Sequence, residues 1–522
     1  MSEFWKTISF IGVALVLTGA AFVSTRDRTS LNATFNDQGK PFFPDFKDPL
    51  ACTDLEVVDF EPSTATATRF RVMFRDKKWV IPSHHNYPAD ARDRLSKTAA
   101  AVMDVVKDTI RSDGIEDTQE TMGVIDPLDA KVTALKGRGK RVTLRDASEK
   151  VLADFVIGNE IKGNERKEGS GGQRYVRVPG QKRIYGVNVK ADLSTRFADW
   201  IETNLLKVDA TKIRRIVFDN YKLQEAGDGR GLVLQRGEKL AIDRKDSSGP
   251  WTMEGIPADQ ELSEDKLRGL TEALGDLKIV GIRPKPPGLK DPNQPEIKLT
   301  LPIVASLQSK GFFLTRQGLL SDQGDVIVTT DEGVAYTLRY GGPFFGTGEE
   351  LTAGQADDVE KKGEEAKKGA AKKPEGTQEN RFLMVTVSFD PTLIAKPKSL
   401  EPKPKPAIKT DALVNIPSNA FAPNPNDPKY IAEQKEAEEK AKQDQADYDK
   451  KIAEGEKRVK ELVDRFGPWY YVTTGDSFRA INLDRTMLVQ PKKAAGSPGD
   501  GPAGLPGPLP PGLRGGFAPG PR

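Results

Sequence analysis

An internal repeat is the feature that most restricts the fold of this 522-residue chain. Two stretches, 53–90 and 211–259, each contain strand-like segments, a tryptophan and the tripeptide Pro-Ala-Asp in the same order. Their first strand-like segments, 53–60 and 211–218, match at Leu55/Ile213, Val58/Ile216 and Phe60/Phe218. Because self-similarity marks a structural unit that occurs more than once, the repeat predicts two related domains.

An amphipathic helix is expected after each Pro-Ala-Asp tripeptide, 88–90 and 257–259. Proline presets the backbone of a first helical turn, and an aspartate can cap its free N–H groups. Apolar residues then recur at helical spacing, namely Leu95, Ala99, Val102 and Val106 in the first copy and Leu267, Leu270, Leu274 and Leu277 in the second. Trp79 and Trp251 are expected to be core residues beneath these helices rather than platforms that stack on a ligand.

The remaining segments alternate apolar and polar residues, as half-buried antiparallel strands do. Strands are expected at 69–74, 78–81, 141–144, 154–158, 174–178 and 184–187 in the first copy. In the second copy they are expected at 231–235, 325–330, 334–340, 381–389, 468–473 and 478–483. A connecting helix is expected over 193–206, with Phe197, Trp200, Ile201 and Leu205 on one side. The sequence thus predicts an α+β fold, with one unit over 50–207 and the other over 208–490.

The first 30 residues predict a single-pass membrane anchor. Residues 7–25 carry no charge, and at about 1.5 Å per residue they span most of a ~30 Å hydrocarbon core. A cleaved signal peptide is the alternative, because the small residues at 19–21 could end its apolar region. We favour an uncleaved anchor in a bacterial cell membrane with the bulk of the chain extracytoplasmic, although the flanking charges do not decide the orientation.

Two insertions are expected in the second unit. Residues 352–380 consist largely of Lys, Glu, Gly and Ala, which predicts a disordered loop between two strands. Residues 391–466 combine a proline-rich spacer with a charged helix over 430–466. A coiled-coil seam is indicated by Ala441, Tyr448, Ile452, Val459, Leu462 and Phe466, but Gln445 and Gly455 interrupt it. A solvated helix lying on its own domain is an equally good interpretation.

The tail, 491–522, is rich in glycine and proline. Its triplets Gly501-Pro502-Ala503 and Gly504-Leu505-Pro506 are collagen-like, but the glycine period fails by Gly512. A disordered tail is therefore expected.

The residues that carry most enzyme chemistry are scarce. The chain has one cysteine, Cys52, and two adjacent histidines, His84 and His85, which we expect in a polar loop. This supply excludes a disulfide framework and four-cysteine zinc sites and disfavours nucleophilic triads. The glycine clusters 137–139 and 169–172 lack the sequence context of a phosphate-binding loop. We therefore predict no catalytic, cofactor-binding or metal residues and no enzyme activity. With 79 Lys and Arg against 76 Asp and Glu, nucleic-acid binding is also not expected.

Several short motifs resemble those of a bacterial family, the domain of unknown function DUF4340. They are Lys-Trp-Val-Ile at 78–81, Pro-Ala-Asp at 88–90, Gly-Val-Ile-Asp-Pro at 123–127, Asp-Phe-Val-Ile-Gly at 154–158, Arg-Tyr-Val-Arg at 174–177 and Ile-Tyr-Gly-Val at 184–187. The likeness covers roughly 55–206 and recurs more weakly over 213–488. The resemblance implies a membrane-anchored protein associated with ABC-2 type exporters and gliding-motility-type auxiliary subunits.

Two functional hypotheses follow. The first is a non-enzymatic accessory or scaffold protein that contacts the proteins of a membrane transport complex. The second is an extracytoplasmic module that binds a small molecule or glycan between the two repeats. Exposed aromatic residues facing a cleft between the repeats would favour the second.

Overall fold

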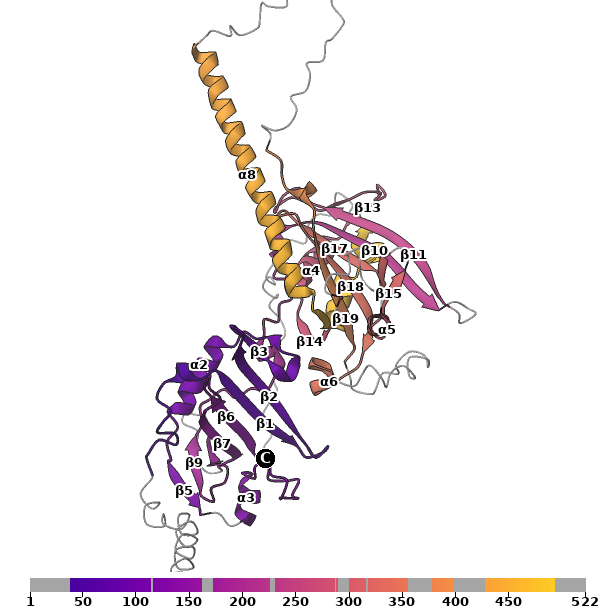
Figure 1. Cartoon of the computed structure of the whole chain (residues 1–522). Helices are drawn as coiled ribbons and strands as arrows, with labels where there is room; N and C mark the ends of the chain where they lie inside the picture. The colour runs from indigo at the N-terminus through magenta and orange to yellow at the C-terminus, as the bar shows by residue number, and fades with distance from the viewer. Residues whose placement is uncertain are drawn as a thin grey trace, which may run out of the picture.

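The computed structural model describes residues 38–113, 116–161, 172–225, 231–286, 288–289, 300–315, 318–354, 378–397 and 428–492. The fold is α+β, as expected, with eight α-helices among these residues and two large antiparallel sheets, each at the centre of one unit. Figure 1 shows the first unit at the lower end, the second above it, and one long helix projecting from the second.

Unit 1 contains a nine-stranded sheet in the order β4-β3-β2-β1-β6-β7-β8-β9-β5. The bounds of the strands are β1 Asp54–Glu61, β2 Thr66–Arg75, β3 Lys78–Ile81, β4 Tyr87–Pro88, β5 Thr109–Ser112, β6 Lys140–Arg145, β7 Val151–Glu160, β8 Gln173–Arg177 and β9 Ile184–Asn188. Its helices are α2 Arg92–Met103 and α3 Glu116–Met122. Every strand expected in this unit is present.

Unit 2 contains an eight-stranded sheet in the order β12-β11-β10-β17-β18-β19-β20-β14. Its strands are β10 Ile213–Glu225, β11 Leu232–Asp243, β12 Thr252–Met253, β14 Ile279–Pro284, β17 Asp325–Thr330, β18 Val334–Phe344, β19 Asn380–Phe389 and β20 Trp469–Thr474. Two small hairpin sheets pair β13 Gln260–Leu262 with β21 Val489–Pro491, and β15 Phe312–Thr315 with β16 Gly318–Ser321. The helices are α4 Glu264–Gly275, α5 Leu301–Gln308, α6 Gly348–Thr352, α8 Pro428–Phe466, α9 Gly475–Ile481 and α10 Arg485–Leu488.

The two sheet orders correspond from β3/β12 through β1/β10 and β6/β17 to β5/β14. Trp79 lies opposite Phe74 in the pair β2–β3. When the pairing of β11 with β12 is extended by one residue, Trp251 lies opposite Arg244. The guanidinium carbon of Arg244 is 4.7 Å from the centroid of the Trp251 ring. When the two sheets are aligned on their tryptophans, Leu55 of unit 1 corresponds to Ile216 of unit 2 rather than to Ile213. The matches expected from sequence are therefore displaced by three residues.

Both tryptophans are half-buried at the core margin instead of fully buried beneath a helix.

The helices α2 and α4 cover their sheets through the expected apolar residues, with Leu95, Ala99 and Val102 buried in α2 and Leu267, Leu270 and Leu274 in α4. The expected capping by the Pro-Ala-Asp aspartates is wrong. The N-cap positions are Ala91 and Ser263, and Pro88 is paired with Val80 in the sheet. The second tripeptide is separated from α4 by β13.

Two other expected elements differ in the structure. Residues 193–206 form only a short 3-10 turn, η4 Phe197–Trp200, because the backbone groups of Trp200, Thr203 and Leu205 bond to the flanking units instead of continuing a helix. Residues 478–483, expected as a strand, lie mostly in α9. Thr474 caps that helix, since its Oγ1 accepts a hydrogen bond from the Ser477 amide at 3.2 Å.

The charged helix α8 is present as expected and re-enters the sheet directly before β20. Its C-terminal part lies on β18 and β19, where Leu462 and Phe466 are buried. Gly455 is buried there too, and a Cβ atom at this position would lie 2.6 Å from both the Glu332 carbonyl oxygen and the Phe389 ring. The glycine that interrupts the seam in sequence is thus the point where the helix crosses the sheet.

The expected anchor, most of the first insertion, residues 398–427 of the second and nearly all of the tail lie outside the described residues. Residues 352–354 and 378–380, at the ends of the first insertion, are part of the fold, and the strands on either side of it, β18 and β19, are paired. Within the described ranges no helix is long and apolar enough to cross a membrane.

Candidate functional site

The face of the unit 1 sheet opposite α2 carries charged residues at alternating positions of β1 and its neighbouring strands. Asp54 and Glu56 of β1 lie between the basic strands β2 and β6. Arg71 Nε donates to Asp54 Oδ1 at 3.0 Å, and Arg145 Nη2 donates to Glu56 Oε2 at 2.8 Å. The bond to Asp54 raises the pKa of the Arg71 guanidinium. Both bonded pairs are diagonal, since Arg71 lies directly opposite Glu56 and Arg145 directly opposite Asp54. Diagonal neighbours are within reach of long side chains, so this alternation of acidic and basic strands stabilises the register.

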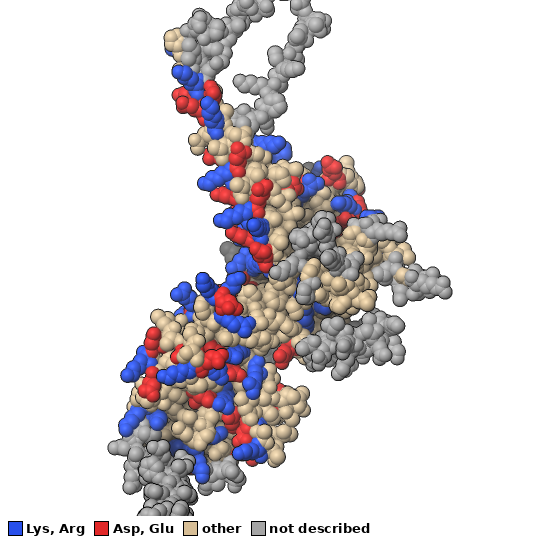
Figure 2. Space-filling model, in the orientation of Figure 1, with Lys and Arg blue, Asp and Glu red and all other residues tan. Residues whose placement is uncertain are grey.

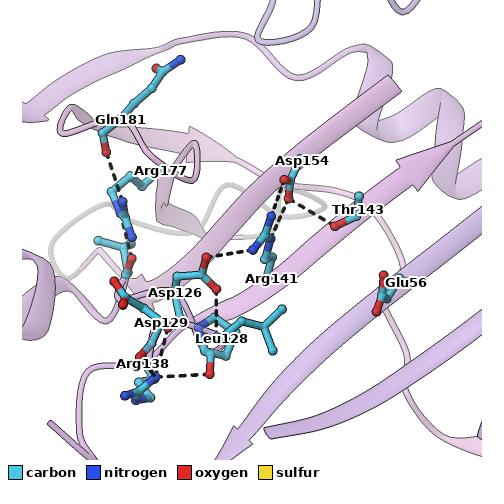
Figure 3. Close-up of polar contacts among 12 residues, drawn as sticks. Glu56, Asp126, Leu128, Asp129, Arg138, Arg141, Thr143, Asp154, Arg177 and Gln181 are labelled. Atoms are coloured by element: carbon cyan, nitrogen blue, oxygen red, sulfur yellow. Dashed lines mark hydrogen bonds and ion pairs between the residues drawn. The ribbon is translucent and has the colours of Figure 1, made fainter. Parts of the chain in front are cut away.

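Arg141 lies at the centre of this charged face (Figure 3). Its Nε and Nη2 donate to the two carboxylate oxygens of Asp154 at 2.9 and 2.7 Å, and its Nη1 donates to Asp126 Oδ2 at 2.9 Å. Thr143 Oγ1 donates to Asp154 at 3.2 Å. The paired bonds to Asp154 raise the pKa of Arg141. One guanidinium therefore joins the strand pair β6–β7 to the loop that contains Asp126.

Two further arginines hold that loop by its backbone. Arg138 Nε donates to the Ala134 carbonyl at 2.9 Å, and its Nη1 donates to the Asp126 and Asp129 carbonyls, both at 3.1 Å. Arg177 is buried and donates to the Val124 carbonyl at 2.9 Å, and burial lowers its pKa. Figure 3 shows Arg177 reaching the loop from β8, while Arg138 binds the loop from its own end, just before β6.

This arrangement favours a structural role over acid–base chemistry. The carboxylates accept charge-assisted hydrogen bonds from guanidinium groups, which hold strands and loop in fixed positions. Among the residues that the structure describes, no cluster of three His, Cys, Asp or Glu side chains could hold a metal ion. The face therefore resembles a rigid, charge-paired surface on which a loop is fastened.

Unit 2 builds the corresponding face differently. There α5 and the β15–β16 hairpin cover the sheet with an apolar cluster that includes Ile303, Leu307, Phe312, Tyr470 and Met384. A charged pair persists at one point, where Arg339 Nε donates to Asp325 Oδ2 at 3.1 Å. Burial raises the pKa of Asp325.

The junction between the units holds both histidines of the chain. His84 Nε2 lies 2.9 Å from Thr352 Oγ1, and His85 Nε2 lies 2.9 Å from the Ala353 carbonyl oxygen. Both contacts reach from unit 1 to the end of α6 in unit 2. The expectation of a polar loop is wrong for His84, which is buried with 5% of its surface exposed.

Cys52, the other residue weighed as a nucleophile, is also buried. Its Sγ lies 3.6 Å from the Asp54 carbonyl oxygen, and burial raises its pKa to about 11. The thiol therefore stays protonated near neutral pH.

The motifs that carry the family resemblance converge on the charged face. Asp126, Asp154 and Arg177 come from three of them and lie within the same hydrogen-bonded region (Figure 3). Residues 79–295 match the model of DUF4340, a domain of unknown function. The match confirms the resemblance. No curated protein and no solved structure matches the chain.

The DUF4340 match does not follow the boundary between the units. It begins in β3, includes the loop and its three arginines, crosses the junction and ends beyond β14. The strands β1 and β2 and the helix α8 lie outside it.

The charged face of the DUF4340 segment was not among the sequence predictions, although a signal for it exists. Acidic residues at 54 and 56, and arginines at 69 and 71 and at 141 and 145, recur with the period of a strand. Complementary charge at this spacing on strands that pair indicates an ion-paired sheet face. The loop contacts of Arg138 leave no such trace, because they are made to backbone carbonyls.

Proposed function

We propose that this DUF4340-containing chain is a non-enzymatic, membrane-anchored accessory or scaffold protein of a bacterial envelope transport complex, and that it contacts its partners through α8. The observation that carries this proposal is the projection of α8 from unit 2 (Figure 1). The helix has 39 residues and is about 58 Å long at 1.5 Å per residue. Its sheet contacts are concentrated toward the C-terminal end.

The projecting part of α8 is built to remain helical in solvent. Lysine and glutamate residues alternate along it (Figure 2), and Lys442 pairs with Glu438 at 2.9 Å one turn away. Such pairs stabilise an isolated helix by roughly 0.2–0.5 kcal/mol each. A helix that stands away from its own core and is stabilised locally can present its surface to another chain.

The direction of α8 supports a bridging role. The first described residues lie at the far end of unit 1, where the Gly39 amide donates to the Lys107 carbonyl at 2.7 Å, just before β5. Figure 1 places β5 at the end of the molecule opposite α8. If residues 7–25 anchor the chain, α8 points away from the membrane and the partner it meets lies at a distance from the bilayer.

The two units are, in this proposal, copies of one ancestral unit. Their strand orders correspond, and counted from the tryptophans Arg141 of β6 occupies the register position of Asp325 in β17. Each makes an ion pair with the adjacent strand, Asp325 with the directly opposite Arg339 and Arg141 with Asp154, which lies diagonally across because Val156 is opposite Arg141. The shared order of strands supports duplication, and the two ion pairs have one position in common, that of Arg141 and Asp325.

The ligand-binding alternative has no specific observation in its favour. The aromatic residues at the junction contact each other, with the rings of Tyr87 and Trp469 at 5.1 Å, and Tyr87 is buried. Neither Trp79 nor Trp251 is among the aromatic residues in contact across this junction.

The contact role of α8 is tested by deletion. Removing 396–465 would also remove Leu462 and the crossing at Gly455, so the deletion should be confined to 400–447, replaced by a short Gly/Ser linker. We expect the shortened chain to stay folded and to lose a copurifying membrane complex. Deletion of 357–375 from the other insertion is the matched control and should retain the complex. Retention by both variants would refute the role of α8.

The expected topology has its own test. Protease added to intact spheroplasts should cleave within 355–377, which composition marks as the most accessible segment. Full protection of this segment in intact spheroplasts, with cleavage after their lysis, would place the body in the cytoplasm and contradict the proposal.

A further inference from the structure

The peptide between the units is fastened separately to each of them. The Trp200 carbonyl accepts a hydrogen bond from the Asp90 amide of unit 1 at 2.8 Å. The Thr203 carbonyl accepts one from the Ile279 amide of unit 2 at 3.0 Å. Only residues 201–202 lie between these two attachment points, so the units are joined by a short connection and their relative position depends on side-chain contacts beyond it.

His84 makes one of the buried contacts between the units. Its ring stacks on Phe197, with centroids 4.4 Å apart and an interplanar angle of 4°, and its Nδ1 lies 3.0 Å from Ser83 Oγ. Phe70 meets it edge-on at 5.7 Å. Its remaining nitrogen reaches Thr352 of unit 2. The imidazole thus fills an aromatic site in one unit while bonding to the other.

The charged surroundings of His84 are cationic. The titratable groups acting on it are His85, next to it in the chain, and Arg283 of β14. Arg283 is held there by donating to the Leu351 carbonyl at 3.2 Å. Burial, together with these two groups, lowers the pKa of His84 to about 4.

We propose that the contact between His84 and Thr352 is an acid-sensitive latch that holds the two units together near neutral pH and releases them on acidification. The neutral imidazole can donate from one nitrogen and accept at the other, and both partners are hydroxyls that can take either role. Protonation would leave both hydrogen bonds possible but would bury a cation beside Arg283. The arrangement in which the two units are in contact therefore favours the neutral form of the His84 imidazole.

The direction of the pH dependence follows from the lowered pKa. A freely exposed histidine has a pKa of about 6.5, so the latch is at full strength above that pH and weakens as the pH falls toward 4. With a pKa of about 4 in the closed state, the ratio of closed to open molecules should fall about 30-fold between pH 8 and pH 5.

The test measures the distance between the units in the full chain. Spin labels at K97C and K239C, both exposed positions, report the two units, and Cys52 is buried and resists labelling. We expect one narrow distance distribution at pH 7.5 and a broader one at pH 5.0, reversible on returning to pH 7.5. An unchanged wild-type distribution at pH 5.0 would overturn the proposal.

Two variants separate the latch from general acid effects. H84Q keeps a polar side chain that does not titrate, and its distribution should be the same at both pH values, whereas H85Q should respond as the wild type does. T352V removes the partner in unit 2 and should broaden the distribution at pH 7.5. A pH response in H84Q equal to that of the wild type would assign the change to other groups and refute the latch.

Discussion

Arg141 binds two carboxylates at once, one on the neighbouring strand and one on a loop 15 residues earlier in the chain. Replacing it by alanine should leave Asp126 and Asp154, with side-chain exposures of 14% and 22%, without their cation. We expect a loss of roughly 2–3 kcal/mol in the free energy of unfolding. Arg69 is the matched control, since its side chain is 60% exposed and 3.5 Å from Glu56. R69A should lose less than about 0.5 kcal/mol. Urea denaturation measures both, and equal losses would contradict the central role of Arg141.

Tryptophans in this chain should differ in their contribution to stability according to burial. Trp200 is fully buried, and its indole N–H donates to the Ser194 carbonyl at 2.9 Å. W200A should therefore cost about 3–5 kcal/mol. Trp79 is only half-buried against Phe74, so W79A should cost less, roughly 1–3 kcal/mol. Thermal unfolding of the two variants ranks them, and a larger loss for W79A would show that Trp79 is a core residue.

At the scale of elements, α8 is fixed by the close approach at Gly455. Alanine has the higher helix propensity, by about 1 kcal/mol, yet its Cβ would meet the Glu332 carbonyl at 2.6 Å. We expect G455A to destabilise unit 2 despite that propensity, because the helix must lift from β19. E454A, at the exposed neighbouring position, should change the unfolding free energy by less than about 0.5 kcal/mol. A stabilising effect of G455A would mean that the helix does not rest on the sheet.

The periodicity of apolar residues predicts most of the strands correctly, but it does not predict the segments that connect them. The strands are predicted well because each sheet has a buried face, which imposes alternation on residues such as Val142 and Leu144. The apolar spacing at 197–205 is also real, and Phe197, Trp200, Ile201 and Leu205 are all buried. They are buried against two different units, however, and the backbone follows those units instead of a helix. Spacing alone cannot distinguish these cases.

The charged face and the junction were beyond prediction for a related reason. Ion pairs such as Arg145 with Glu56 join residues 89 positions apart, and His84 meets Thr352 over 268 positions. Such pairs depend on the order of strands and on the packing of the units, neither of which is determined by local pattern. The helix cap at Thr474, in contrast, could have been predicted, because a threonine followed by glycine and aspartate is typical of a helix start.

At the scale of the whole molecule, cleavage within the first insertion tests whether the parts of the chain before and after it stay associated. A protease site placed within 355–377 divides the chain between β18 and β19, which pair from Val334/Phe389 to Phe344/Asn380. We expect the two fragments to elute together in native size-exclusion chromatography and to separate in urea. The buried cluster that joins both units includes residues from either side of the cut, such as Leu338 and Val385. Separation without denaturant would show that this shared core is weak.

The placement of α8 gives the molecule a mechanical property. About 40 Å of helix lies before the crossing at Gly455 and about 17 Å after it, so the helix can act as a lever with a ratio near 2.4, at 1.5 Å per residue. Its short arm ends at Phe466, which is buried, and Arg465 Nη2 donates to the Asn204 carbonyl at 3.3 Å. Asn204 follows Thr203, where the connecting peptide is attached to unit 2, and its Nδ2 donates to the Gly275 carbonyl. A sideways pull on the N-terminal end of α8 would therefore reach the attachment point of the connecting peptide on unit 2 as a larger force over a shorter distance.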